Sequence, residues 1–539
     1  MRVSSSRVLK YILLSYLGVT VVLPIIVLFS KIRGENIANV FSSYQFLPML
    51  RNSLVTTLLA TVISVSLAFF LAYLILRTRV RYKSVWITMF TIPMLIPSIS
   101  HGMGLVLLLG ENGILTNLLS LKLELYGYLG ITLGSVLYSF PVAFLMFYDS
   151  LYYEDYTVYE SAEVLGISKV RMFGVITLPS MKRTVISAVL AVFTMVFTDY
   201  GVPLMTGGTA MTLPVYMYRE VIGMMNFSNG SVVGVVLLAP AIVAFLVDLR
   251  KSGAGSSSST VTKRYYVKEN RRRDKIAYAV LSLALLMLCL PILAFVCLSF
   301  VKQYPIDLSF SLGTFRKLIS SGIGMYFVNS VAVALLTALF GTAFSYYAAY
   351  STARGGKQIS NRVLHFISML PLAIPGVVLG LSYVMSFHKT PFYGTIVILV
   401  IVNIVHFFSS PYLMAYNTLT KFNPNLEDVA GSLGIGRLRM LVSVYLPSTV
   451  TTVVEMYSYF FVNAMITISA VSFLVNFRTM PLSLLIPQLE SQSFIEGTAL
   501  VSLLILLVNL ALKAIAFFVK RRLYIAERAT ASGNGSPTP

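Results

Sequence analysis

The stretch from Tyr159 to Pro179 reads YESAEVLGISKVRMFGVITLP, and the stretch from Glu427 to Pro447 reads EDVAGSLGIGRLRMLVSVYLP. The two stretches share a glycine at the same position, then Ile-x-Lys/Arg-x-Arg-Met, then a closing Leu-Pro. A segment repeated at long range is the sequence sign of a repeated structural unit. The two stretches therefore predict a chain built from two related halves.

The composition predicts an integral membrane protein. Of the 539 residues 57% are hydrophobic and only 11% are charged, whereas a soluble globular protein carries about 25% charged residues. A helix crosses the bilayer core with about 20 apolar residues. The expected fold class is all-α: a polytopic membrane protein with about twelve transmembrane helices in two parallel six-helix repeats. The twelve apolar runs lie at 11–30, 54–76, 86–109, 127–148, 184–205, 230–249, 276–300, 328–350, 363–387, 394–417, 449–475 and 498–519.

The positive charges indicate the topology. The net charge is +21, and Lys and Arg residues crowd the segments that lie inside if both termini are cytoplasmic. These segments are 2–10, 77–83, 250–275, 354–362 and 520–528. Topology thus explains the charge, and no nucleic-acid partner is expected. The first run is expected to be a retained span, since no small-x-small cleavage site follows it.

A linker divides the chain into its two halves. Residues 250–275 read RKSGAGSSSSTVTKRYYVKENRRRDK, a flexible Ser/Gly core with basic flanks that favour the cytoplasmic face. We expect a first half at 1–249, a second at 276–524 and a flexible tail at 525–539. With six spans each, both halves start inside, so the repeats are parallel and a pathway between them is expected. Motifs match in the same order: NSLVTTLL at Asn52 with NSVAVALL at Asn329, Pro93-x-x-x-Pro97 with Pro371-x-x-x-Pro375, Ser139-Phe-Pro141 with Ser409-Ser-Pro411, and Thr212-Leu-Pro214 with Thr479-Met-Pro481.

Each copy of the opening segment predicts a helix–turn–helix outside the bilayer, on the cytoplasmic side. A cap residue and a first-turn acid begin each copy: Thr157 with Glu160, and Asn425 with Asp428. Gly166 and Gly434 follow where the first helix should stop, and a glycine there can take a left-handed backbone at no steric cost. An amphipathic loop on lipid headgroups would explain one copy. Two copies with a glycine in the same register favour a pair of docking loops for a partner with twofold symmetry.

The pattern resembles the signature loop of binding-protein-dependent ABC importer permeases: Glu-Ala-Ala, three residues, Gly, nine residues, Ile-x-Leu-Pro. The first copy gives Glu160-Ser161-Ala162, Gly166 and Ile176-Thr177-Leu178-Pro179. The second gives Asp428-Val429-Ala430, Gly434 and Val444-Tyr445-Leu446-Pro447. The departures from the pattern are Ser161, Asp428, Val429 and Val444.

The resemblance implies a type I ABC importer-like fold and a set of partners. It implies two ATP-binding subunits at the cytoplasmic face and an extracytoplasmic substrate-binding protein, in the plasma (inner) membrane of a prokaryote. The sequence has no G-x-x-x-x-G-K-[ST] motif, so we expect no enzyme activity and no cofactor in this chain, with ATP and Mg bound by the partner subunits. The residues expected at the ATPase contact are Glu160, Ala162, Gly166 and Arg171 in the first loop and Asp428, Ala430, Gly434 and Arg439 in the second.

Two residues are candidates for the solute pathway, Asp199 and Asn463. Asp199 lies in FTDYGVP near the outer end of a span, where an acid needs water or a partner. It is either a gate residue or the cap of a helix end at the interface. The four histidines show no ligand spacing, so no metal site is expected.

The loops around these two residues resemble the fused permeases for iron(III), thiamine, polyamines and 2-aminoethylphosphonate. The sequence around Asp199 is most similar to that of the 2-aminoethylphosphonate permeases. Iron(III), thiamine and polyamines are the alternative solutes. An ion-coupled secondary transporter is the rival class. That class favours intramembrane ionisable groups and often inverted repeats, whereas the repeats predicted here are parallel.

Overall fold

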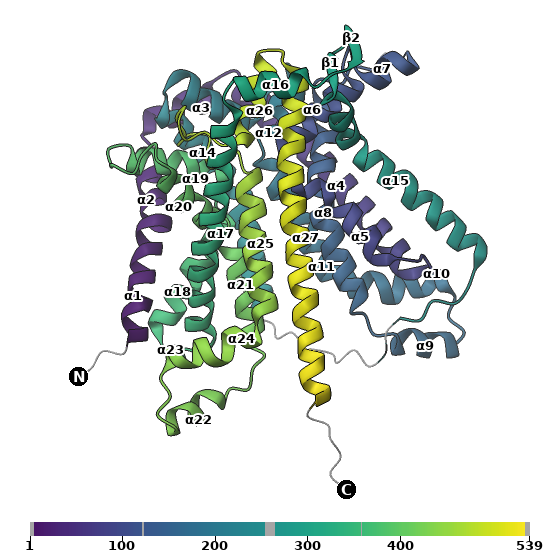
Figure 1. Ribbon diagram of the computed structural model, residues 1–539, viewed down its shortest axis with the longest axis vertical. Helices are drawn as coiled ribbons and strands as arrows, with labels where there is room; N and C mark the ends of the chain where they lie inside the picture. The colour runs from purple at the N-terminus through teal and green to yellow at the C-terminus, as the bar shows by residue number, and fades with distance from the viewer. Residues whose placement is uncertain (1–4, 121–122, 254–262, 264, 357, 534–539) are drawn as a thin grey trace. The chain divides into compact units, whose positions relative to one another are not determined.

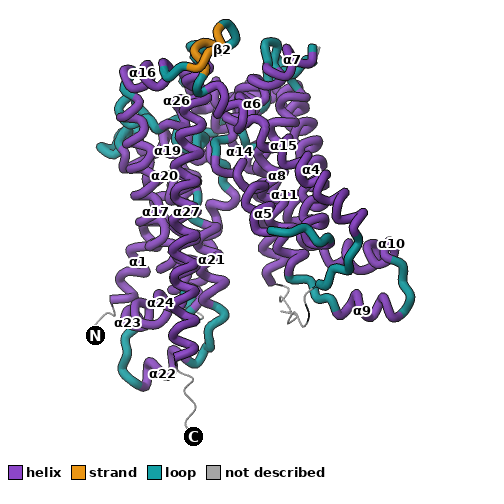
Figure 2. Tube along the Cα trace, turned by 45° about the vertical axis from the view of Figure 1, so that its right-hand side comes forward, coloured by secondary structure: helices purple, strands orange, loops and turns teal. Residues whose placement is uncertain are grey.

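The computed structural model describes residues 5–120, 123–253, 263, 265–356 and 358–533. Most of this part of the chain is helical, and it also holds an antiparallel pair of strands, β1 (Val301–Gln303) and β2 (Asp307–Phe310) (Figures 1 and 2). The all-α fold class is confirmed. The Ser/Gly core of the predicted linker, 254–262, and the end of the predicted tail, 534–539, lie outside the described residues.

The helices form two compact units that differ from the two halves of the sequence. Unit 1 comprises the described residues of Met1–Arg33, Phe315–Gln492 and Leu503–Pro539. Unit 2 comprises those of Gly34–Thr314 and Ser493–Ser502. The first helices of the two halves are thus exchanged: α1 and α2 belong to unit 1, and α15 belongs to unit 2.

In unit 2, the long helices α4, α8 and α11 pack side by side (Figure 1). The phenylalanines of α8, Phe140, Phe144 and Phe147, recur every three or four residues and are fully buried in the common core. The helices and turns of this unit are α3 (Gly34–Ser42), α4 (Phe46–Arg77), α5 (Lys83–Thr91), η2 (Ile92–Leu95), α6 (Ser98–Leu109), α7 (Ile114–Leu119), α8 (Tyr128–Tyr152), α9 (Thr157–Val164), α10 (Lys169–Met172), η3 (Phe173–Thr177), α11 (Leu178–Phe197), α12 (Gly201–Thr206), α13 (Leu213–Tyr218), η4 (Arg219–Gly223), α14 (Phe227–Gly253) and α15 (Arg271–Leu298).

In unit 1, α17, α21 and α25 form the corresponding trio. Gly341 of α17 lets α25 approach closely, because a Cβ there would lie 2.9 Å from the ring of Phe460. The remaining elements of the chain are α1 (Ser5–Leu17), η1 (Gly18–Val22), α2 (Leu23–Ser30), α16 (Gly313–Ser320), α17 (Ile323–Ala353), α18 (Ile359–Met369), η5 (Leu370–Ala373), α19 (Gly376–Phe387), α20 (Ile396–His406), α21 (Ser409–Leu419), α22 (Leu426–Ser432), α23 (Arg437–Met440), η6 (Leu441–Tyr445), α24 (Leu446–Ser448), α25 (Val450–Ile466), α26 (Leu482–Ser491) and α27 (Ile495–Gly533).

The sequence repeat is also a repeat of hydrogen bonds. Asn52 on α4 donates from its side-chain amide to the carbonyl of Met211, at 3.0 Å. Asn329 on α17 donates in the same way to the carbonyl of Arg478, at 2.7 Å. Each bond ties the long helix of its unit to the loop that carries the Thr-x-Pro motif, so the matching motifs mark equivalent places in the two units.

The exchange of first helices rests on close contacts that are distant in sequence. Gly104 of α6 faces α15, where an added Cβ would lie 2.5 Å from the Cβ of Pro291. In unit 1, α2 packs on α19, and the hydroxyl of Tyr383 donates to the carbonyl of Thr20 at 2.7 Å. The ranges 1–249 and 276–524 therefore delimit the repeats of the sequence rather than the compact units, because a first helix can cross to the other bundle without changing its own apolar pattern.

Helices of spanning length are abundant among the described residues. By length and composition, nine helices there can cross a membrane, or eleven if each of two bent pairs counts as one span. The predicted run 363–387 is one of these pairs, bent by 112° where Pro375 begins α19, and the run 394–417 is the other, bent by 51°. Pro411 lacks the N–H that would bond back to the preceding turn, which accounts for the second break.

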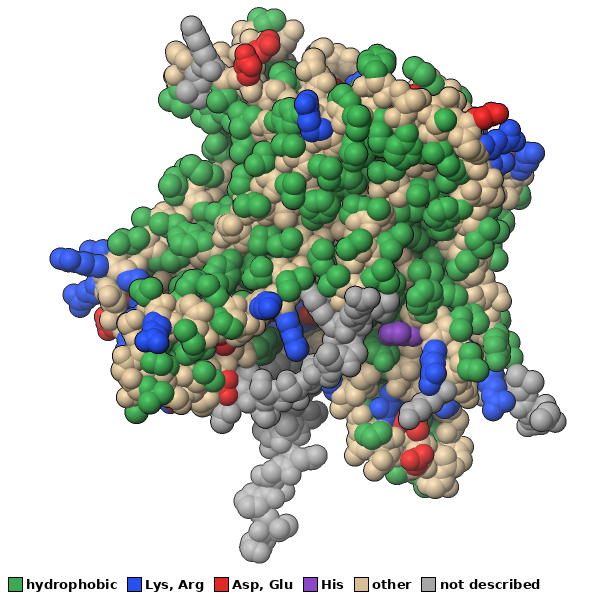
Figure 3. Space-filling model, turned by 180° about the vertical axis from the view of Figure 1, so that it is seen from behind, with side chains coloured by type: hydrophobic (Ala, Val, Ile, Leu, Met, Phe, Trp, Pro, Cys, Tyr) green, Lys and Arg blue, Asp and Glu red, His purple; other side chains and the backbone are tan. Residues whose placement is uncertain are grey.

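The ends of two predicted helices also differ from the structure. The run expected at 449–475 is helical only over Val450–Ile466, a shorter apolar helix. In contrast, α27 continues to Gly533 through the start of the expected flexible tail, where YIAERATA is rich in residues that favour helix. Hydrophobic side chains cover much of the face seen in Figure 3, which agrees with a surface that contacts lipid.

Candidate functional site: the paired docking loops

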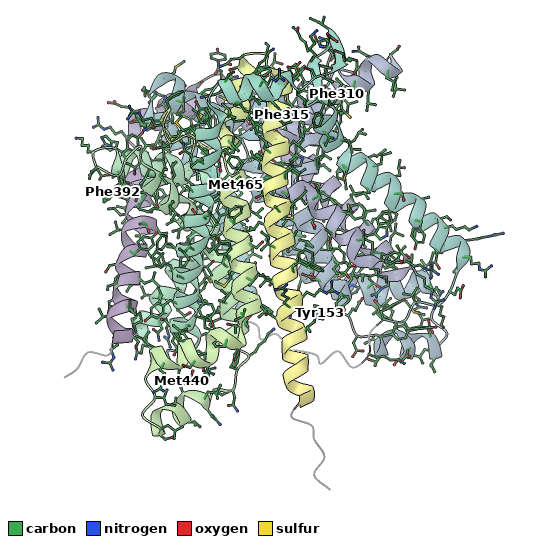
Figure 4. All side chains as sticks on the ribbon, in the orientation of Figure 1. Tyr153, Phe310, Phe315, Phe392, Met440 and Met465 are labelled. Atoms are coloured by element: carbon green, nitrogen blue, oxygen red, sulfur yellow. The ribbon has the colours of Figure 1, made fainter. Side chains whose placement is uncertain are left out.

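The first docking loop, residues 154–179, is a helix, a tight turn and a second helix that follows the end of α8 near Tyr153 (Figure 4). Its helix α9 ends at Val164, and Gly166 has a φ of +70°. The N–H of Ile167 donates to the carbonyl of Ala162 at 3.0 Å. This bond and the left-handed glycine form a Schellman turn, which satisfies a carbonyl at the helix end.

The second docking loop, residues 422–447, repeats this geometry. Helix α22 is followed by Gly434 with a φ of +68°, and the N–H of Ile435 donates to the carbonyl of Ala430 at 2.8 Å. Met440, at the end of α23 in Figure 4, is buried like its counterpart Met172. The predicted left-handed glycine turns are thus present in both copies.

One predicted cap position is confirmed and the other is wrong: Asn425 is the N-cap of α22, whereas Tyr156, not Thr157, is the N-cap of α9. Thr157 is the first residue of α9, and its N–H donates to the carboxylate of Asp155 at 3.1 Å. Asn425 precedes α22 but makes no side-chain cap bond; its N–H donates to the side chain of Asn423 at 2.9 Å. An Asp or Asn side chain that bonds the backbone two residues on forms an Asx turn, and this turn starts each loop in place of a capping box.

The predicted docking residues divide into an exposed group and a buried group. Ala162 and Ala430 are only 4% and 5% exposed, so their side chains support the loop from inside. Large apolar side chains beside the glycines are exposed instead, with Leu165 at 76% and Leu433 at 69%. The predicted residues that face outward are Gly166, Arg171, Asp428, Gly434 and Arg439, with Glu160 partly exposed.

Arg77, the last residue of α4, attaches the first docking loop to the helix bundle. Its side chain is 5% exposed and forms a salt bridge with Glu154, which is 8% exposed. Glu154 also accepts a hydrogen bond from the hydroxyl of Tyr159 at 2.8 Å. A charged pair this deeply buried resists separation, because each partner would be left as an unpaired buried charge.

Arg354, just after α17, makes the equivalent connection in unit 1. Its Nε lies 2.7 Å from Oε1 of Glu427 on α22, and the hydroxyl of Tyr445 donates to the same carboxylate. Both clusters therefore consist of Arg, Glu and Tyr, but the acid sits at a different place in the repeat. Tyr159 and Glu427 both open their quoted stretches, so the tyrosine of one cluster occupies the position of the glutamate of the other.

The charge of Glu427 is stabilised by its neighbours. Burial raises the pKa of its carboxyl, but the hydrogen bonds from Arg354 and Tyr445, together with the Arg354 charge, outweigh burial and hold the pKa below its ordinary value. Burial, followed by the hydrogen bond to Glu427, raises the pKa of the Tyr445 hydroxyl to about 12. The cluster thus holds a carboxylate, a guanidinium and a neutral phenol at neutral pH.

The end of the linker forms a strap along α9, made of Lys263 and residues 265–269. Lys263 pairs with Glu160, whose hydrogen bond raises the pKa of that lysine, and Lys268 pairs with Glu163 at 2.7 Å. The ring of Tyr265 is centred 3.5 Å from the guanidinium carbon of Arg77 and packs edge-on against Tyr156 and Tyr159. The strap therefore covers the Arg77 cluster. It also forms an ion pair with Glu160, one of the residues predicted to contact the ATPase. Asp428, the equivalent acid of the second loop, is exposed and has no ion pair among the described residues.

We expect Tyr265→Ala to loosen α9. The variant removes a cation–π contact and two aromatic contacts, which together contribute about 2 kcal/mol. Hydrogen exchange of the α9 amides should become about tenfold faster or more. Tyr266→Ala is the matched control, because its side chain is 59% exposed. Equal exchange in the two variants would show that the strap does not hold α9.

The two pathway candidates lie in different compact units. Asp199 follows α11, and its carboxylate accepts the N–H of Val202 in α12 at 2.9 Å. This bond agrees with the interpretation of Asp199 as the cap of a helix end. The role of Asp199 as a gate residue stays a prediction. Asn463 donates to the carbonyl of Tyr459, one turn earlier in α25, at 2.8 Å. Among the described residues no cluster of three or more His, Cys, Asp or Glu could hold a metal ion.

Arg77 and Arg354 were not predicted from the sequence as functional residues. Arginines at the ends of spans were fully explained by topology, so neither was singled out. A signal was present, because each arginine follows an Ala-Tyr pair, Ala72-Tyr73 or Ala349-Tyr350, by the same four residues. These two arginines occupy the same position in the two repeats, and this shared position distinguishes them from the other charged residues of the loops.

Comparison with known proteins gives several relatives. The chain is similar to the "Ferric transport system permease protein FbpB" of Actinobacillus pleuropneumoniae, with 25% identity over 437 residues that cover 77% of this chain and 63% of that protein. The "Thiamine transport system permease protein ThiP" of Escherichia coli K12 is 23% identical over 343 residues, 62% of each chain. The "Spermidine/putrescine transport system permease protein PotC homolog" of Mycoplasma genitalium is 26% identical over 209 residues, 38% of this chain and 70% of that protein. The chain thus spans less than two thirds of the ferric and thiamine relatives.

A family model described as "Binding-protein-dependent transport system inner membrane component" matches the chain twice, at residues 64–249 and 341–524. The two matches together cover more than half of the chain, and each includes one docking loop. The chain therefore belongs to the family of binding-protein-dependent transport system inner membrane components and carries two copies of the family's domain.

Proposed function

We propose that this chain is the membrane permease of an ATP-driven ABC importer and forms both halves of the translocation pathway. The observation that carries the proposal is the pair of docking loops, in which Leu165 and Leu433 are exposed beside identical left-handed turns. Exposed apolar side chains at the same place in two repeats fit a partner that binds both in the same way. The family match supports this assignment.

The proposed partners supply the energy and the solute. Two ATP-binding subunits at the cytoplasmic face bind ATP and Mg²⁺ and receive one docking loop each. A binding protein on the opposite face delivers the solute. The distribution of Lys and Arg supports a plasma-membrane orientation in which both termini are cytoplasmic.

The buried Arg–Glu pairs give the docking loops a route to the membrane helices. A displacement of α9 acts on α4 through Glu154 and Arg77, and a displacement of α22 acts on α17 through Glu427 and Arg354. Rigid helices carry such displacements over their whole length, which permits the pathway to open alternately on its two sides. In this mechanism the chain itself breaks no bond; it converts the movement of its partners into access for the solute.

The solute is the finer part of the proposal. The names of the relatives mention ferric iron, thiamine and spermidine/putrescine. The ferric relative matches the largest share of the chain among these three, and iron(III) is therefore the first candidate. The sequence around Asp199 favours 2-aminoethylphosphonate, which is the second. In every case the binding protein sets most of the selectivity.

Transport into proteoliposomes tests the proposal. The chain is reconstituted with the proposed ATPase and binding protein, and uptake of each of the four solute classes is measured with ATP present or absent. We expect uptake of one class only, dependent on both ATP and the binding protein. Uptake driven by an ion gradient without the ATPase would instead identify a secondary transporter.

We expect Asp199→Asn to lower ATP-dependent uptake by about tenfold without releasing the ATPase subunits. The amide keeps the size of the side chain but lacks the negative charge that a gate or a cationic solute would use, and one charge-assisted hydrogen bond contributes about 1.5–3 kcal/mol. Unchanged uptake would show that Asp199 serves only as the cap of α12.

A further inference from the structure

A cavity of about 340 Å³ opens in unit 1 beside the second docking loop. It is lined by the start of α1, the end of α17, the start of α18 and the turn that begins α23. Its volume is at the lower end of the range of small-molecule sites, which is about 300–1,000 Å³. The proposed transport cycle uses one of its lining residues, Arg354, but assigns no ligand to the cavity.

The cavity is strongly basic. Arg7, Lys10, Arg354 and Arg437 line it, and no carboxylate is among its lining residues. Glu427 neutralises Arg354 from outside the cavity. The other three cations have no ion pair among the described residues.

Lys10 shows most clearly that a counter-ion is lacking. Its residue is 7% exposed, and its ammonium group donates to three neutral acceptors, the side chains of Gln358 at 2.9 Å, Ser360 at 2.8 Å and Asn361 at 3.2 Å. A lysine is almost never this buried without a charged partner. The three acceptors fix the ammonium in place and leave its charge uncompensated.

Unit 2 provides an internal comparison. There α15 packs on α4, α5 and α6 as α1 packs on α17 and α18 and α2 on α19. At the corresponding end of unit 2, Arg79 pairs with Glu269 at 3.0 Å, and its backbone N–H donates to Asp274 at 3.2 Å. Acidic side chains thus reach this corner of the repeat in unit 2, whereas no carboxylate lines the cavity in unit 1.

We propose that the cavity binds a phosphate group. Arginine and lysine side chains that converge without carboxylates match the charge and the acceptor oxygens of a phosphate ester. The phosphate can belong to an anionic phospholipid or to a soluble compound. Leu14 lies one turn after Lys10 on the same face of α1, is partly exposed, and offers an apolar surface for an acyl chain.

The occupant would act on the second docking loop. Arg437 is the first residue of α23 and lies three residues after Gly434. A bound phosphate therefore joins α1 and α18 to the turn that presents Leu433. The strap supports the first docking loop in a comparable way. The two loops are thus held differently, the first by the strap and the second by the bound phosphate.

Lipid titration by native mass spectrometry tests the site with the full chain in neutral detergent. The variant is Arg7→Gln/Arg437→Gln, which leaves Lys10 and its three hydrogen bonds in place and changes exposed side chains only. The control, Lys421→Gln/Arg521→Gln, removes the same charge from exposed positions outside the cavity. With phosphatidylglycerol as the probe we expect the variant to bind about thirtyfold more weakly than wild type, since each cation near a lipid phosphate contributes about fivefold. The control should bind like wild type.

A second series separates the two sources of phosphate. The chain is placed in phosphatidylcholine nanodiscs, and inorganic phosphate is added while thermal unfolding is followed. A stabilisation by phosphate that is lost in the variant supports a soluble ligand; stabilisation by phosphatidylglycerol alone, also lost in the variant, supports a lipid. The proposal is overturned if neither probe stabilises the wild type, or if variant and control respond alike.

Discussion

Arginine at both Gly166 and Gly434 is expected to release the ATPase subunits and to leave the membrane part of the chain folded. At both glycines an added Cβ meets no atom of this chain within 4 Å, so the new side chain would point into the open space where the proposed partner would dock. The left-handed backbone adds a strain of about 1–3 kcal/mol at each site. A charged side chain in the centre of an apolar contact typically costs enough to weaken binding about a hundredfold or more.

The measurement is co-purification of the ATPase with each variant, together with the thermal unfolding of the permease. Gly322→Arg is the matched control, because Gly322 also has a positive φ, of +79°, and open space around it but lies at the start of α17. The control should keep its ATPase subunits. Retention of the ATPase by the double variant would count against docking at the two loops.

Arg77→Ala is expected to lower the free energy of unfolding by about 3–5 kcal/mol, because it leaves the buried carboxylate of Glu154 unpaired. Arg79→Ala, which breaks a pair with side chains 48% and 63% exposed, should cost less than about 1 kcal/mol. Chemical unfolding in detergent, followed by circular dichroism, measures both. Similar losses in the two variants would contradict the role given to burial.

A rescue experiment separates charge from packing. Glu154→Gln in the Arg77→Ala background removes the unpaired charge and should restore part of the lost stability. The rescued chain should still transport poorly, since α9 is no longer joined to α4 by an ion pair. Full recovery of transport would show that the pair serves stability alone.

The local features of the fold could be predicted from the sequence. The helix–turn–helix loops, the left-handed conformation of Gly166 and Gly434, and the repeat of motifs all depend on residues close together in the chain. Some uninterrupted spans were also predicted within a few residues, as for α8, which was expected at 127–148 and is observed over Tyr128–Tyr152. The helix α4 begins at Phe46, eight residues before its expected start. Short-range patterns suffice for such features because hydrogen bonding within a helix or turn is decided locally.

The long-range features could not be predicted. The exchange of α1 and α15 between the bundles leaves no trace in hydropathy, because a lipid-facing helix has the same pattern whichever bundle it contacts. The prolines signalled breaks, but a proline does not by itself set the angle of a bend, which is 112° before α19. The strap was predicted as a plain linker, since Tyr265 acquires its role only through Arg77, which is far away in sequence.

The number of ATPase subunits bound by one chain tests the central claim most directly. Native mass spectrometry of the chain purified together with the proposed ATPase measures this number. Two docking loops of the same geometry predict two ATPase subunits for each copy of the chain. A complex that holds one ATPase subunit per chain, with all other partners saturated, would contradict the account.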